Sequence, residues 1–268
     1  MRGRAVLLLV VVLALGGSAC ASDDTEVRPA TEADRGATTT TEAPNETPPD
    51  TASESPSSDT VVREFFNAVG ADDVKSLDQA LTVTEPNSPA NAYIRYLTEL
   101  SRAGGESPLT PEFDGDQVKA CGTTTEGESV CFVYSDISVN NAGQIVSFAV
   151  DGVPLADRIS WDGPIATAQG VTARSAIAYE SAGGDLLVVI EIENGASTPF
   201  AASSFDSVYI EEGRQYPLGQ TSLFTDVRPG ATAVDVAYIE AGQRGGTLEY
   251  RGHINDFATE VVLPISVP

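Results

Sequence analysis

The sequence predicts an α+β module, three helices plus an antiparallel meander, followed by an all-β immunoglobulin-like sandwich. Apolar residues recur at helical spacing only in the first half of the folded region, up to about residue 104. Strand-forming runs with hairpin turns then follow up to residue 150. From residue 165 onward, about seven short strands alternate with turns rich in Gly, Asn and Pro, which is typical of a sandwich.

The first module, residues 59–158, is predicted to begin with three helices that start at capping residues near 59, 72 and 88. Strands are expected over 118–121, 130–139 and 144–150, with a hairpin turn at 140–143. The apolar faces of the three helices are Val62, Phe65, Phe66 and Val69, then Val74, Leu77 and Leu81, and finally Tyr93, Ile94, Leu97 and Leu100.

The stretch from Val61 to Val69, followed shortly by Asp72-Asp73, resembles the first helix of nuclear-transport-factor-2-like domains. That resemblance implies a cone-shaped α+β fold, and such folds often enclose a concave apolar cavity. Small-ligand capture in this cone is therefore one candidate function. The same aromatic spacings are also typical of a plain hydrophobic core. The candidate lining residues are Tyr93, Tyr96, Phe132, Tyr134 and Phe148.

The second module, residues 165–268, has four characteristic segments: Leu187 to Asn194, Phe200 to Ile210, Gly213 to Pro217 and Val227 to Gly230. In these segments it resembles immunoglobulin-like domains of unknown function from Gram-positive and actinobacterial lipoproteins, kin to a small secreted mycobacterial antigen. The resemblance implies no catalytic motif. Trp161 is expected at the joint between the modules, packed rather than stacked on a ligand.

Residues 1–20 have the organisation of a bacterial signal peptide. Arg2 and Arg4 precede a short apolar run that is about half the ~20 residues of a spanning helix. The sequence Gly17-Ser18-Ala19-Cys20 resembles a lipobox, although Gly17 stands where Leu is usual. An ordinary secretory cut is the alternative. The cysteine count favours lipidation of Cys20 with fatty acyl chains such as palmitate, because it leaves one pair among three cysteines.

The next segment, residues 21–58, is expected to be a disordered acidic tether rich in Thr, Pro and Glu. Its Thr38 to Thr41 run is a candidate glycosylation tract. Removing the leader takes away Arg2 and Arg4, which leaves 13 basic and 39 acidic residues and a net charge of −26. Such a surface repels nucleic acid and anionic headgroups, so the N-terminal lipid must provide the membrane attachment.

The remaining cysteines, Cys121 and Cys131, are expected to form a disulfide between neighbouring strands in an oxidising compartment. A redox role is disfavoured because the spacing differs from C-x-x-C. A metal role is disfavoured because the nearby sequence supplies no further ligands. We therefore assign the pair a structural role.

No catalytic pattern emerges from the sequence. The single histidine, His253, is placed in a turn and interpreted as a surface residue. Asp114-Gly115-Asp116 lacks the rest of a calcium loop, so a turn is the simpler interpretation. We expect no enzyme, no metal and no cofactor. The predicted function is protein binding at the extracytoplasmic face of the cell membrane, with an envelope or host protein as partner.

Overall fold

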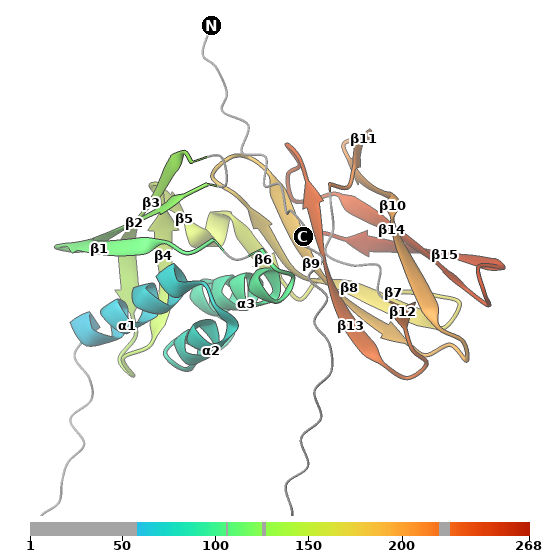
Figure 1. Ribbon diagram of the computed structural model, residues 1–268, viewed down its shortest axis with the longest axis horizontal. Coiled ribbons are helices and arrows are strands. Elements are labelled where there is room, and N and C mark those ends of the chain that lie inside the picture. The colour runs from blue at the N-terminus through green and yellow to red at the C-terminus, as the bar shows by residue number, and fades with distance from the viewer. Residues whose placement is uncertain (1–57, 106, 125–126, 220–225) are drawn as a thin grey trace, which may run out of the picture. The chain divides into compact units, whose positions relative to one another are not determined.

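The computed structural model describes residues 58–105, 107–124, 127–219 and 226–268. The predicted leader, Cys20 and nearly all of the predicted tether lie outside these residues. The described chain begins with helices α1 (Ser58–Ala71), α2 (Val74–Thr82) and α3 (Pro89–Arg102) (Figure 1). In this part of the chain, no helix is both long and apolar enough to cross a membrane.

Local capping interactions explain where two of these helices start. The Ser76 amide donates a 3.0 Å hydrogen bond to the Asp73 carboxylate at the N-terminus of α2. The Asn91 amide donates a 3.2 Å bond to the Ser88 hydroxyl at the start of α3, where Pro89 occupies the first turn. Both caps satisfy amide groups that a helix N-terminus leaves unpaired, as the sequence predicted.

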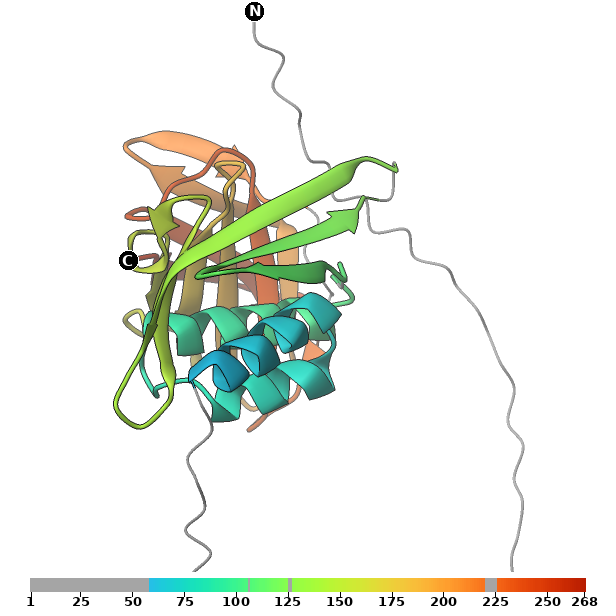
Figure 2. The ribbon, with the colours of Figure 1, turned by 90° about the vertical axis from the view of Figure 1, so that its left-hand side faces the viewer.

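The first sheet contains five antiparallel strands in the order β1-β2-β3-β4-β5, and Figure 2 shows it beside the three helices. Its inner face contributes Val118, Tyr134 and Phe148 to one core with the helices. A short 3-10 helix, η1 (Leu155–Asp157), follows this sheet. The strands are β1 (Thr110–Asp114), β2 (Gln117–Thr123), β3 (Ser129–Val139), β4 (Ile145–Val150) and β5 (Val153–Pro154).

The second half of the chain forms two further antiparallel sheets that enclose a second core. One sheet, called sheet B, has the order β13-β9-β8-β6, with β7 also paired to β8. Its strands are β6 (Ile159–Trp161), β7 (Ala166–Ala168), β8 (Val171–Glu180), β9 (Leu186–Asn194) and β13 (Thr232–Ile239). The α+β region followed by an all-β region thus confirms the predicted order of fold classes.

The other sheet, called sheet C, has the order β11-β10-β14-β15, with β12 also paired to β10. Its inner residues meet those of sheet B in the second core, which includes Phe200, Tyr250 and Leu263. The strands of sheet C are β10 (Phe200–Glu211), β11 (Arg214–Pro217), β12 (Asp226–Val227), β14 (Thr247–Ile254) and β15 (Thr259–Ser266).

Part of sheet B is buried on both faces. Alternate residues of β8 and β9 face opposite sides, so Ala178 and Val188 join the second core. Ile177, Tyr179 and Val189 point the other way and join the core of the helices. Both faces of this part of sheet B are therefore covered by protein, which explains why β8 and β9 are apolar at successive positions there.

Candidate interaction surfaces

The predicted ligand-pocket aromatics lie in a packed interior. Tyr93, Tyr96, Tyr134 and Phe148 are buried, and Phe132 is half-buried against the same core. Ring centroids are 5.5 Å apart for Tyr93 and Phe148, 5.6 Å for Tyr134 and Phe148, and 6.1 Å for Tyr93 and Tyr96. These distances are those of aromatic rings in direct contact. The residues therefore lie in or against a packed core, and a role of this core in ligand capture stays a prediction.

The buried tyrosines also offer no proton acceptor near neutral pH. Desolvation by burial raises the pKa of Tyr134 to about 12. The same cause raises the pKa values of Tyr93, Tyr96 and Tyr179 above the ordinary value for tyrosine. A neutral phenol remains in each case. The cluster is therefore a neutral part of the core.

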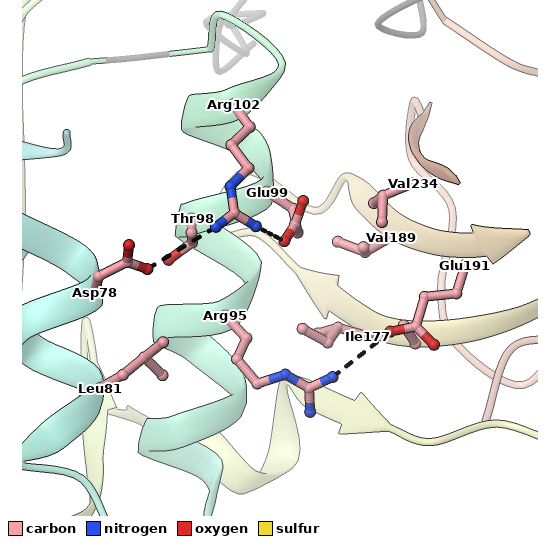
Figure 3. A pocket seen from close by; sticks show the side chains of 11 residues that line it. Asp78, Leu81, Arg95, Thr98, Glu99, Arg102, Ile177, Val189, Glu191 and Val234 are labelled. Carbon is pink, nitrogen blue, oxygen red and sulfur yellow. Dashed lines mark hydrogen bonds and ion pairs between the residues drawn. The ribbon is translucent and has the colours of Figure 1, made fainter. Parts of the chain in front are cut away.

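A small recess lies between helices α2 and α3 and sheet B (Figure 3). Its volume is about 90 Å³, well below the ~300–1,000 Å³ of small-molecule sites. Arg95 approaches Glu191 at 4.0 Å across the recess, and Arg102 lies 3.9 Å from Asp78. The lining residues are Asp78, Leu81, Arg95, Thr98, Glu99, Arg102, Ala176, Ile177, Val189, Glu191 and Val234.

Carboxylates balance the arginines around this recess. Glu191 contacts Arg174 at 2.7 Å as well as Arg95, and Arg174 also lies 3.3 Å from Asp162. Arg102 pairs with Glu99 in addition to Asp78. Partly exposed ion pairs of this kind contribute about 0–1 kcal/mol each. The arginines around the recess are therefore paired with carboxylates, and the recess has no excess of positive charge that would attract an anionic ligand.

A wider groove of about 540 Å³ runs between α1 and α2. Its size falls within the range of small-molecule sites, but its lining is polar or small, with Glu64 as the single charged side chain. Ligand pockets are instead mostly apolar and aromatic with a few convergent polar groups. The lining residues are Glu64, Asn67, Ala68, Ser76, Gln79, Ala80, Thr82 and Val83.

Cys121 and Cys131 face each other on β2 and β3, and their sulfur atoms are 2.12 Å apart. The cysteine pair expected between neighbouring strands is therefore present in the structure. Among the described residues, no three His, Cys, Asp or Glu side chains come together in a group suited to a metal ion.

His253 lies on strand β14 and not in a turn, which corrects the placement predicted from the sequence. It stands opposite Glu260 on β15, and its ring lies 5.5 Å from that of Phe257. The sequence did not single out Phe257, although an aromatic residue directly after Asn255-Asp256 is a detectable signal for an exposed hairpin side chain. The expected turn at Asp114-Gly115-Asp116 does connect β1 to β2.

Comparisons of the chain with protein-family models, curated proteins and solved structures find no match. The resemblances to nuclear-transport-factor-2-like and immunoglobulin-like domains remain predictions. Any functional assignment must accordingly be based on the residues of this chain.

Proposed function

We propose that the protein is a lipid-anchored lipoprotein on the extracytoplasmic face of the cell membrane, and that it acts by binding other proteins without catalysis. The observation that carries this proposal is the division of its three cysteines. Cys121 and Cys131 are at bonding distance from each other. Cys20 is left over, directly after a signal-peptide pattern and within a lipobox-like sequence.

The strand order supports an immunoglobulin-like assignment of the sandwich. In such domains strand B lies between A and E, while C and F are neighbours in the opposite sheet. Here β9 lies between β8 and β13, and β10 pairs with β14 in sheet C. We infer that β8, β9, β10, β13, β14 and β15 correspond to strands A, B, C, E, F and G. Domains of this type use the loops at their ends for recognition.

The described side chains favour binding over catalysis. The buried tyrosines form a packed cluster, and the recess beside α3 is small and charge-matched. His253 contacts an aromatic ring on the surface of the hairpin. A hydrolytic site instead needs a base oriented by an acid and placed against a nucleophile. These packed and charge-matched features support the proposed noncatalytic role.

The location is tested by the N-terminus of the mature protein. Mass spectrometry of the membrane fraction should find a diacylated Cys20 as the first residue, with Cys121 and Cys131 oxidised. The Cys20→Ala variant should lose its membrane association. A mature chain that begins elsewhere, or a cytosolic protein with reduced thiols, would contradict the proposed location.

The binding role is tested separately by crosslinking in intact cells. Wild-type protein should yield a reproducible partner adduct, which should be lost when Cys20→Ala releases the protein from the membrane. Turnover of a small substrate by the purified protein, without any specific adduct, would overturn the noncatalytic assignment.

A further inference from the structure

The turn between β14 and β15 presents the most exposed of the large apolar side chains in the described chain. Phe257 is 72% exposed. Its backbone is left-handed, with φ of 67°, as are Asn255 at 54° and Asp256 at 52°. This conformation is costly for a bulky residue and persists only where the surrounding structure holds it. Because isolated exposed apolar residues are common on protein surfaces, the surroundings of Phe257 must decide whether it has a role.

Hydrogen bonds hold the turn in place from a neighbouring loop. The Asn255 amide donates to the Thr198 hydroxyl at 3.2 Å, and that hydroxyl donates to the Asn255 side-chain oxygen at 3.1 Å. The Asn255 side-chain nitrogen also donates to Thr259 at 3.3 Å. Thr198 belongs to the segment between β9 and β10. Ordering costs reduce binding affinity, so a turn fixed in advance is suited to recognition.

Acidic residues lie on the strands next to His253 and in the turn beside Phe257. The strand registers place Asp226, Ala201, His253 and Glu260 side by side on β12, β10, β14 and β15. Residues directly opposite one another share a face of the sheet. Sequence neighbours of this row, including Phe200, are buried in the second core, so the row faces outward. The centroid of the His253 ring lies 5.5 Å from that of Phe257.

We propose that the β14–β15 tip, defined as Asp226, His253, Asp256, Phe257 and Glu260, binds a basic, partly apolar segment of a partner protein. The Phe257 ring offers its face to an aliphatic stem or a cation, and the carboxylates attract guanidinium or ammonium groups. The net charge of −24 for the whole chain adds long-range attraction toward a basic partner. An anionic lipid surface is disfavoured for the same reason. This inference rests on the proposed binding function and names its surface.

Site-specific photocrosslinking with the full-length, anchored protein tests the tip. A photoreactive phenylalanine analogue is placed at position 257 in intact cells. The matched control has the analogue at Ile165, which is 67% exposed on a different segment. We expect position 257 to yield one discrete protein adduct at about tenfold the yield of position 165, as for a residue central to an interface. The crosslinked peptide of the partner should contain Lys or Arg.

Three variants separate the chemistry of the tip from its folding, each measured by copurification of the same partner. Phe257→Ser should abolish copurification, whereas Phe257→Tyr should retain it. The double variant Asp226→Asn and Asp256→Asn should reduce copurification several-fold. Added salt should cause a similar loss with wild-type protein, because it screens the same charges. Glu260 is left intact because it pairs with Arg251 at 2.9 Å. Unchanged melting temperatures and an intact cysteine pair show that the variants are folded.

The following results at position 257 refute the tip as the binding surface. A lipid adduct at position 257 indicates membrane insertion, and an adduct of twice the protein's mass indicates self-association. Equal yields at positions 257 and 165 indicate no specific surface. The photoreactive residue can also be placed at another position of Phe257→Ser protein. If the same partner adduct still forms there, the tip is excluded as the binding surface, while the proposed binding function stands. If the wild-type chain is not acylated at Cys20, the proposed location fails independently of the tip.

Discussion

Replacing Tyr179 with alanine tests whether the α+β region and the sandwich unfold together. Tyr179 lies on β8 and is 7% exposed. Its ring centroid is 5.4 Å from that of Tyr93 and 4.9 Å from that of Tyr96, both on α3. Because the side chain bridges sheet B and the helices, its loss leaves a cavity in their shared core. Truncating a buried aromatic residue to alanine typically costs about 3–5 kcal/mol.

For a folded unit of this size, such a loss should lower Tm by about 6–20 °C. The assay is thermal unfolding followed by far-ultraviolet circular dichroism and by fluorescence of Trp161, the only tryptophan. Trp161 packs against the same core from β6, so both signals should shift together. Phe257→Ala is the control, and its exposed side chain should change the stability by less than about 0.5 kcal/mol. Two separate transitions, one at its wild-type temperature, would refute the shared-core reasoning.

Three further perturbations give distinct results. Burial raises the pKa of Asp235, so the stability contributed by its protonated form is present below about pH 3.8 and is lost as pH rises through the folded-state pKa. Asp235→Asn keeps the contact with Tyr250 without a charge. The free energy of unfolding of this variant relative to wild type, measured with urea, should therefore rise from pH 4 to pH 7. A difference that stays constant over this range contradicts the prediction. Reduction of Cys121–Cys131, separated by 10 positions, should cost about 3 kcal/mol in the loop-entropy model, and an unchanged urea midpoint would exclude a stabilising role. Ser88→Ala should cost about 1 kcal/mol through loss of the α3 cap, and a Tm equal to that of wild type would show that the cap is dispensable.

Local signals in the sequence predicted the helices well. Asp72 or Asp73, and Ser88, were recognisable as caps because a short polar side chain precedes an apolar helical pattern in each case. The structure contains capping bonds to Asp73 and Ser88. The cysteine pair was equally accessible, since only one pairing remains once Cys20 is set aside. These features depend on few residues that are close in sequence.

Features that depend on distant packing were not predictable. The apolar pattern of β8 indicates that Tyr179 is buried but does not identify α3 as the element that covers it. Aromatic spacing likewise cannot distinguish a hollow cone from a filled one, so it could not foresee that the rings of Tyr93 and Phe148 are in direct contact. Gly252 and the polar residues near it are typical of a turn, so the predicted strand ended before His253 and this residue was assigned to a turn. Its strand position follows from pairing with Glu260.

Because sheet B has protein on both sides, the chain cannot be divided at residue 158 without consequence. A fragment that contains the two C-terminal sheets alone would present Ile177, Tyr179, Val189 and Val236 to water, a contiguous apolar area suited to aggregation. A fragment of the first 158 residues would lack the surface against which α3 packs. Recombinant expression and gene fusion should therefore keep both halves together. In evolution, either half could be exchanged only for one that buries the same apolar face of sheet B.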